Sequence, residues 1–129
     1  MKLPDLSRVD DAGVIEYHGH AGLVATAAKD AGLRHFDVDL GTAIDKATLF
    51  ATLARGLHLP EHFGNNFDAL ADVLEDRDWL GRKGCAIHLA HVASFRHGHP
   101  HDWETLEEIL TEAAGFWRER NLAFWVLLG

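Results

Sequence analysis

Short apolar segments alternate with amphipathic segments along most of this chain. Residues 13–17 and 36–40 are typical of strands, the second because apolar and acidic side chains alternate with a period of two. Residues 85–91 and 122–128 are almost wholly apolar, as strands covered on both faces are. Four such segments separated by helical ones predict a mostly parallel sheet with right-handed crossovers.

The segments between these strands carry apolar residues at helical spacing. Residues 21–31 predict a small helix, and residues 43–56 predict a longer one whose start is indicated by the capping-box spacing of Thr42 and Asp45. The expected fold is therefore α/β, with helices flanking a small, mostly parallel sheet in two or three layers.

Two further helices are indicated in the second half of the chain. The first follows Asn66, and its apolar stripe comprises Phe67, Leu70, Ala71 and Leu74. The second follows a loop over residues 94–101, with Asp102 as the expected N-cap and Asn121 as the residue that ends it. Its buried face is predicted to comprise Leu106, Ile109, Leu110, Ala113 and Trp117.

The length of 129 residues is that of one domain with a real core. The only cysteine, Cys85, lies in an apolar run and is expected to be a buried, reduced thiol. No apolar stretch approaches the roughly 20 residues of a membrane span, and residues 1–5 do not resemble a secretory signal. We therefore expect a cytoplasmic protein with no membrane partner.

The chain is acidic, with 20 Asp and Glu against 12 Lys and Arg and a formal net charge of -8. This charge repels nucleic-acid phosphates and attracts basic proteins. Direct nucleic-acid binding is not expected, whereas a basic protein partner is.

Acidic residues are concentrated between Leu59 and Leu80, where six acids accompany one base. Asp68, Asp72 and Asp76 recur at i, i+4 and i+8, which places them on one face of a helix, with Glu75 beside them. Like charges at that spacing destabilise an isolated helix by about 0.2–0.5 kcal/mol per pair. Most acidic runs are simply solvated faces, and the charge pattern alone does not distinguish that interpretation from a binding surface.

The longer string that contains these acids is more specific. It runs Leu59-Pro60-Glu61-His62-Phe63-Gly64-Asn65-Asn66-Phe67-Asp68-Ala69-Leu70-Ala71-Asp72-Val73-Leu74. It resembles the signature of the barstar family of intracellular ribonuclease inhibitors: Leu-Pro, an acid, two aromatic residues, Gly, Asn two residues later, an apolar residue, Asp-Ala-Leu, and a second Asp four residues after the first. The resemblance spans residues 35–129, so residues 1–34 are expected to form an added β-α unit at the sheet edge of a single domain.

The resemblance implies an inhibitor that is not an enzyme, needs no cofactor, and is monomeric. Its acidic helix would enter the cationic active site of a basic, extracellular-type ribonuclease, with Asp72 in the place of a substrate phosphate and Asp68 meeting a second cation. Gly64 and Asn66 would shape the contacting loop, and His62 would take the position of an aromatic ring that packs on the enzyme. The expected partner-binding residues are His62, Gly64, Asn66, Asp68, Asp72, Glu75 and Asp76.

Three positions differ from the family pattern. Ala71 replaces a tryptophan that contacts the enzyme, which removes a large hydrophobic contact. His62 replaces an aromatic residue, and its protonated form would oppose a cationic site. A carboxylate that the family can place on the last helix aligns with Phe116, with Glu112 nearby.

Other functions are also compatible with parts of the sequence. His97, His99 and His101 alternate, with His88 and His91 upstream, and imidazoles at such spacing can bind zinc, copper or nickel if the segment is extended. Pro100 interrupts that run. An immunity protein against a different basic nuclease or toxin would use the same acidic helix. Catalysis is not indicated, because the chain has no nucleophile motif, phosphate-binding glycine loop or H-E-x-x-H sequence.

Overall fold

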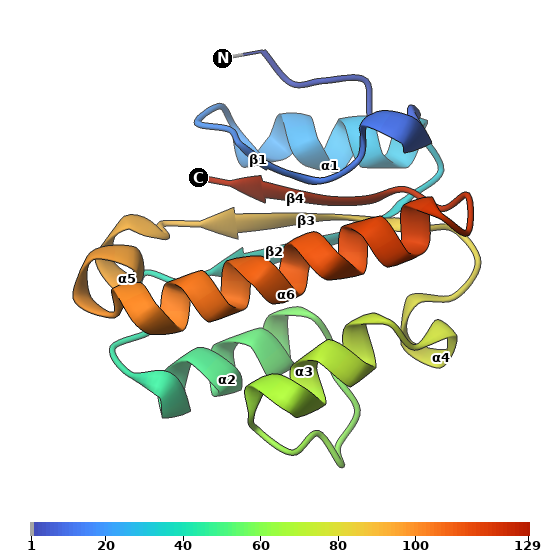
Figure 1. Cartoon of the computed structure of the whole chain (residues 1–129). Coiled ribbons are helices and arrows are strands. Elements are labelled where there is room, and N and C mark those ends of the chain that lie inside the picture. Colours follow the sequence, from blue (N-terminus) through green and yellow to red (C-terminus); the bar gives the residue numbers. More distant parts are fainter. Residues whose placement is uncertain (1) are drawn as a thin grey trace.

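The computed structural model describes residues 2–129, and Figure 1 shows how its elements are arranged. A 3-10 turn, η1, precedes the first strand. The elements in chain order are η1 (Val9–Asp11), β1 (Val14–Glu16), α1 (Ala21–Asp30), β2 (Arg34–Asp39), α2 (Lys46–Gly56), α3 (Phe67–Leu74), α4 (Arg77–Leu80), β3 (Cys85–Ala90), α5 (Ala93–Gly98), α6 (Pro100–Arg118) and β4 (Phe124–Leu128).

The four strands form one parallel sheet in the order β1-β4-β3-β2. This confirms the α/β fold and the parallel pairing predicted from the apolar segments. The two wholly apolar strands, β3 and β4, lie in the middle, and β1 is an edge strand beside β4. The other edge is β2, where Asp37 and Asp39 point to solvent on the face opposite the main core. Its period-two pattern therefore reflects an edge strand covered on one side.

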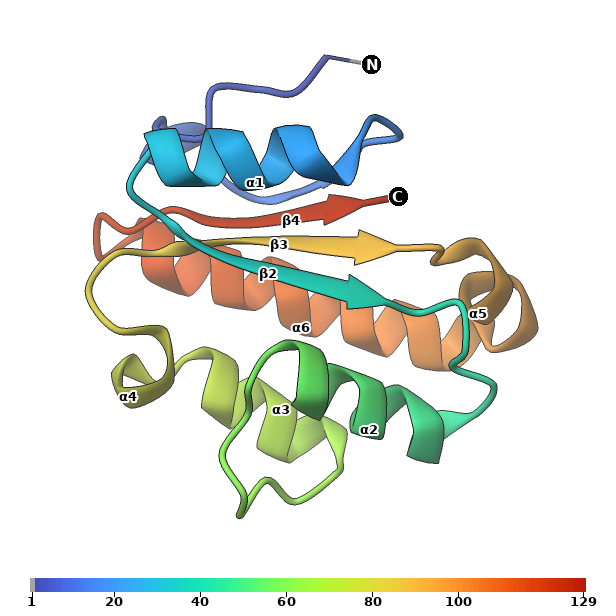
Figure 2. The same ribbon diagram turned by 180° about the vertical axis from the view of Figure 1, so that it is seen from behind.

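Helices cover both faces of the sheet, which gives three layers (Figures 1 and 2). Alternate residues of β4 separate the two cores: Phe124, Val126 and Leu128 face the larger core, and Trp125 and Leu127 face the smaller. The larger core lies between the sheet and α2, α3 and α6, whereas α1 and residues 3–12 cover the smaller one. No helix among residues 2–129 is long and apolar enough to cross a membrane.

The start of α2 differs from the prediction. The helix begins at Lys46 rather than near residue 43, and its capping box joins Asp45 to Thr48 instead of Thr42 to Asp45. The Asp45 carboxylate accepts the Thr48 N–H at 2.8 Å, and the Thr48 hydroxyl oxygen accepts the Asp45 N–H at 3.1 Å. Ile44 consequently precedes the helix and is exposed, although its spacing had placed it on the apolar face.

The segment predicted to be a loop over residues 94–101 is largely helical. It contains α5 and the first turn of α6, so Asp102 lies inside that first turn and His99 is the N-cap. Pro100 occupies the start of α6, where a missing N–H has no helical partner to lose. His97, His99 and His101 therefore do not alternate along an extended segment.

Indole groups tie the helical layer together. Trp79, Trp103, Trp117 and Trp125 are all buried, and the burial of Trp117 was predicted from its helical spacing. The Trp117 Nε1–H donates to the carbonyl of Leu74 at 2.7 Å, which joins α6 to the end of α3. Because the last carbonyls of a helix have no partner within it, this bond fixes the C-terminus of α3 against the core.

Side chains also join residues 2–34 to the rest of the chain. The Trp125 Nε1–H donates to the carbonyl of Leu6 at 2.9 Å, and the Arg118 guanidinium donates to the carbonyl of Ala12 at 2.6 Å. Arg96 forms an ion pair with Glu16 at 2.9 Å. These contacts accompany the pairing of β1 with β4 on the edge of the sheet.

Candidate functional site

The loop between α2 and α3 is anchored by aromatic side chains. Phe63 is buried and lies edge-on to Phe50, with ring centroids 6.2 Å apart, and Phe67 packs on the same ring at 4.9 Å. A turn closes the loop, where the Phe63 N–H donates to the carbonyl of Pro60 at 2.9 Å. The second position of the aromatic pair in the motif is thus a structural anchor, and the first, His62, is left exposed beside it.

Asn66 begins α3 in the way that the sequence indicates. Its side-chain oxygen accepts the Ala69 N–H at 2.7 Å, and its amide donates to the carbonyl of Gly64 at 3.2 Å. A β-carbon at Gly64 would lie 3.3 Å from the Asn66 amide and 3.4 Å from the Ala69 β-carbon. A small residue at Gly64 therefore leaves room for the cap, and the loop and helix are fixed relative to each other.

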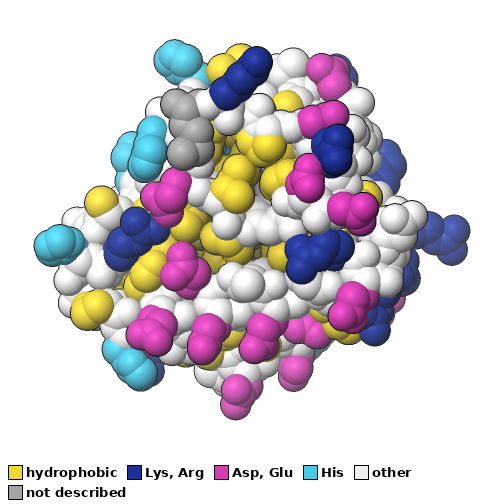
Figure 3. All heavy atoms as spheres, turned by 45° about the horizontal axis from the view of Figure 1, so that its top comes forward, with side chains coloured by type: hydrophobic (Ala, Val, Ile, Leu, Met, Phe, Trp, Pro, Cys, Tyr) yellow, Lys and Arg dark blue, Asp and Glu magenta, His cyan; other side chains and the backbone are white. Residues whose placement is uncertain are grey.

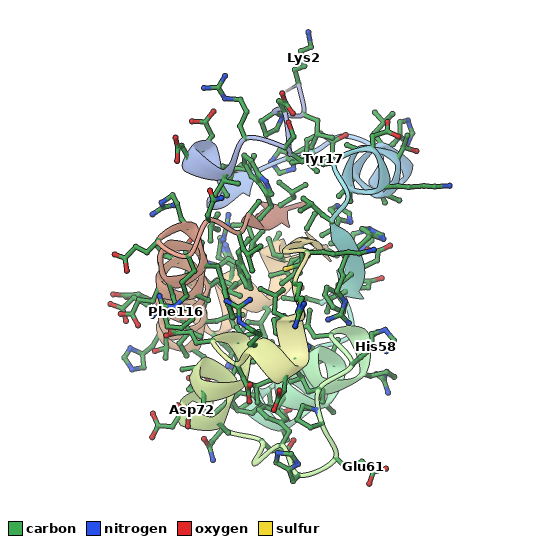
Figure 4. The ribbon with its side chains drawn as sticks, turned by 90° about the vertical axis from the view of Figure 1, so that its right-hand side faces the viewer. Lys2, Tyr17, His58, Glu61, Asp72 and Phe116 are labelled. Atoms are coloured by element: carbon green, nitrogen blue, oxygen red, sulfur yellow. The ribbon has the colours of Figure 1, made fainter. Side chains whose placement is uncertain are left out.

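The amphipathic character of α3 places two of the predicted carboxylates in solvent. Leu70 and Leu74 are buried, whereas Asp68 and Asp72 are exposed on the outer side of the helix. Asp68 lies in the first turn, where the helix dipole favours a negative charge. In Figure 4, Asp72 lies on α3 at the lower end of the molecule and points away from the core.

The prediction that Asp76 continues this helix face is wrong. α3 ends at Leu74, Glu75 is its C-cap, and Asp76 is instead the N-cap of the short helix α4. The Asp76 carboxylate accepts the Asp78 N–H at 2.8 Å. A competing cap thus ends the i, i+4, i+8 series after two members, and Asp76 lies outside α3.

Glu75 and Glu112 extend the negative charge from α3 to α6. Partial burial raises the pKa of Glu75, and the nearby carboxylates of Glu112 and Asp72 raise it further, while Arg120 lowers it. Glu112 is only a secondary candidate from the sequence, because alignment puts Phe116 at the matching position. The packing of α3 on α6 brings the Glu112 carboxylate close enough to Glu75 to raise its pKa. We call Asp68, Asp72, Glu75 and Glu112 the acidic surface.

Within residues 2–129, none of these four carboxylates lies within ion-pair distance of a Lys or Arg side chain. The nearby guanidinium groups stack on rings instead: Arg77 lies 5.3 Å from the Trp117 ring centre, and Arg120 lies 3.5 Å from that of Phe116. Figure 3 shows that Asp and Glu side chains also form a row across the lower part of the adjoining face. The four carboxylates of the acidic surface therefore have no ion-pair partner among these residues, and only the more distant charge of Arg120 acts on Glu75.

Two of the positions that differ from the family pattern lie beside this surface. His62 is exposed at the tip of the α2–α3 loop, and Ala71 is half-buried on α3. A small Ala71 side chain next to Asp72 leaves the neighbourhood of the carboxylate flatter than a tryptophan would. The bulky contact that the family pattern supplies from this position is absent here.

The histidines proposed as metal ligands are not brought together. His97 and His101 are exposed on α5 and α6, and the His99 ring stacks on Phe95 and lies 2.7 Å from the carbonyl of Ile44. Across residues 2–129, no three His, Cys, Asp or Glu side chains are placed to hold one metal ion.

A separate hollow at the carboxyl ends of the strands contains the two upstream histidines. His88 is buried and lies 3.1 Å from Asp37, and His91 lies 2.9 Å from Asp39. Each imidazole thus has a carboxylate partner on β2, and these histidines lie on β3 and just after it, apart from the acidic surface.

The barstar (barnase inhibitor) family model matches residues 33–129. The chain belongs to the barstar family. The match covers β2 to β4, and thus the acidic helix and its loop, and leaves α1 and β1 outside it. Members of this family are inhibitors of barnase-like ribonucleases rather than enzymes. A search of curated proteins gave no match.

Proposed function

We propose that this protein inhibits a basic ribonuclease by placing the acidic surface of α3 in the enzyme's cationic active site. Asp72 occupies the position of a substrate phosphate, and Asp68 and Glu75 meet flanking cations. His62, Gly64 and Asn66 form the loop that contacts the enzyme beside them, and Asp76 contributes from the start of α4.

The observation that carries the proposal is the set of exposed carboxylates without ion-pair partners on a helix that is fixed at both ends. Asn66 holds the start of α3, and Trp117 holds its end. Because the helix needs no reordering, association does not lose the entropy of folding a segment. The lysine, arginine and histidine side chains of a nuclease site supply the charges that this surface lacks.

The raised pKa of Glu75 supports the same mechanism. Partial burial first, and then the like charges of Glu112 and Asp72, destabilise the free protein when Glu75 is ionised. A bound cation removes this repulsion, so part of the electrostatic strain of the free state is released on binding.

The proposal includes the setting in which the inhibitor acts. Residues 1–34 and 35–129 form one domain, which binds as a monomer, performs no catalysis and contacts no nucleic acid. Burial raises the pKa of the Cys85 thiol, which keeps it protonated and unreactive and suits a reducing cytoplasm. The enzyme is an extracellular-type ribonuclease or a related basic toxin, against which the inhibitor gives immunity to the cell that makes it.

Calorimetric titration against a barnase-type ribonuclease tests the proposal. We expect tight 1:1 binding that weakens as salt rises from about 50 to about 500 mM, because exposed charges are screened. Asp72→Ala should abolish most of the affinity, while Asp30→Ala, which removes an exposed carboxylate from α1 across the sheet, should leave it unchanged. Equal affinity of the two variants, or no binding to this enzyme and to a panel of basic ribonucleases, would refute the assignment.

A further inference from the structure

A second hollow lies beside the acidic surface, between the α2–α3 loop and α4. Its volume is about 420 Å³. Pro60 and His62 come from the loop, Val73 from α3, and Asp76, Asp78 and Trp79 from α4. We call this hollow the α4 socket. Figure 4 looks onto this side of the molecule, with His58 and Glu61 marking the loop and Asp72 marking α3.

The apolar wall of the α4 socket is rigid. Trp79 is 8% exposed, and its indole N–H donates to the carbonyl of Leu57 at 2.8 Å. Its ring stacks on Phe36 with centroids 5.5 Å apart. Pro60 and Val73 are half-buried beside it. The wall is therefore formed before any ligand arrives.

The socket has two carboxylates, Asp76 and Asp78, and both are exposed. Among residues 2–129, neither lies within ion-pair distance of a Lys or Arg side chain. Arg34 also lines the hollow, but its guanidinium donates to the carbonyls of Trp79 and Leu80 and lies 4.8 Å from the Phe36 ring centre. That group therefore bonds the C-terminal end of α4 and is not paired with the carboxylates.

A long basic side chain matches this combination of wall and charge. Lysine and arginine bury an aliphatic stem along apolar surface while the charged head stays near solvent or carboxylates. Arginine fits better than lysine, because its planar fork can bond two carboxylate acceptors at once. Val73 and Asp76 of the socket directly follow Asp72 and Glu75 of the acidic surface in the sequence, so one partner can cover both.

We propose that the α4 socket receives an arginine side chain of the inhibited ribonuclease and thereby helps to select the partner. The inference rests on the proposed inhibitor function and names a feature of the enzyme that the acidic surface alone does not specify. The required partner is a basic nuclease with an exposed arginine beside its active-site cleft.

The socket can be tested without the nuclease by NMR titration of the full chain with Nα-acetyl-arginine methylamide. We expect saturable shifts of the Trp79 indole N–H and the Val73 methyl signals with a millimolar dissociation constant, since exposed charge contacts are weak. The citrulline analogue has the same shape without the charge and should cause no such shifts. Equal shifts with both compounds, or shifts confined to other surfaces, would overturn the proposal.

The decisive variant is Asp76→Asn with Asp78→Asn, and its matched control is Asp10→Asn with Asp30→Asn, which removes two exposed charges elsewhere. Asparagine caps a helix as well as aspartate does, so α4 should remain folded. The socket variant should lose the arginine-induced shifts and bind a barnase-type ribonuclease about three- to tenfold more weakly than the control.

The two proposals fail in different ways. If Asp72→Ala abolishes inhibition while the socket variant equals its control, the socket is wrong and the inhibitor function stands. If the unmodified protein inhibits no ribonuclease, the function is wrong, and the arginine titration still decides whether the socket binds a guanidinium group.

Discussion

The bond between Trp117 and Leu74 offers a sharp test of how the core supports the acidic helix. Trp117→Phe keeps a buried ring but removes the donor that reaches the Leu74 carbonyl at 2.7 Å. That carbonyl lies at the end of α3. In a longer helix it would accept the N–H of Asp78, four residues further on, but this N–H donates to the Asp76 side chain instead. The substitution therefore leaves a buried acceptor without a partner.

An unsatisfied buried polar group costs about 1–3 kcal/mol, and the smaller ring leaves a small cavity that adds to this. We expect the free energy of unfolding to fall by about 2–3 kcal/mol, or a loss of roughly 10 °C in Tm for a domain of this size. Urea unfolding measures the first quantity. Amide exchange in α3 should also accelerate, because its C-terminal end is released.

Trp125→Phe is the matched control. It removes an equivalent buried indole bond, to the carbonyl of Leu6 at 2.9 Å, but on the opposite face of the sheet. A similar loss of stability is expected without selective exchange in α3. A Trp117→Phe protein as stable as the parent, or one with α3 exchange no faster than in Trp125→Phe, would refute the reasoning.

Three other predictions follow from the structure. Asn66→Ala should lower the free energy of unfolding by about 1 kcal/mol, while Asn66→Asp should restore the cap, as urea titration can measure. Gly84→Ala should prevent stable folding, because Gly84 has φ +77° and a β-carbon there would overlap the Ala123 carbonyl oxygen. Soluble yield and circular dichroism test this prediction, and a variant with native-like yield and spectrum would contradict it. Glu75→Gln should stabilise the protein at pH 7, because the pKa of Glu75 is raised in the folded state. The Glu75 carboxylate lowers the free energy of unfolding as pH rises from about 4.5 through the folded-state pKa. In acid, Glu75 is protonated in both the folded and the unfolded protein, so Glu75→Gln should no longer stabilise the protein there. A stabilisation of equal size in acid would exclude this cause.

Most of the fold was predictable because the strands differ clearly in their patterns. The wholly apolar β3 and β4 occupy the centre of the sheet, and the alternating β2 is an edge strand. Apolar spacing also located α3 and most of α6. These patterns are reliable because the burial of one or both faces affects every residue of a strand or helix, so the apolar spacing repeats along the whole element.

Element boundaries were less predictable because neighbouring polar residues compete as caps. Thr42 and Asp45 have the right spacing for a capping box, yet Asp45 bonds Thr48, three residues further on. In the same way, Asp76 caps α4 rather than continuing α3. A side chain that can bond a nearby N–H offers the backbone two alternatives, and tertiary packing decides between them.

The proximity of Glu112 to Glu75 was unpredictable for a different reason. It lies far from Glu75 in the sequence, and only the packing of α6 on α3 brings the two carboxylates together. An alignment that matched Phe116 to the family's acidic position gave no reason to prefer it. Glu112 lies four residues before Phe116, so it is on the same side of α6, one turn away from the position that the alignment matches.

The positions of Arg77 and Arg120 explain why these two residues do not form ion pairs with the acidic surface. Arg120 already lowers the pKa of Glu75, and an ion pair from Arg120 or from Arg77 would reduce the repulsion around this carboxylate further. Both guanidiniums instead stack on aromatic rings of α6. These cation–π contacts leave both guanidinium groups beyond ion-pair distance of the four carboxylates, and within residues 2–129 no other Lys or Arg pairs with them, so a partner's cations can bind there. Replacing Phe116 by leucine should release Arg120 toward Glu75 and weaken binding of a basic partner, although it removes no carboxylate.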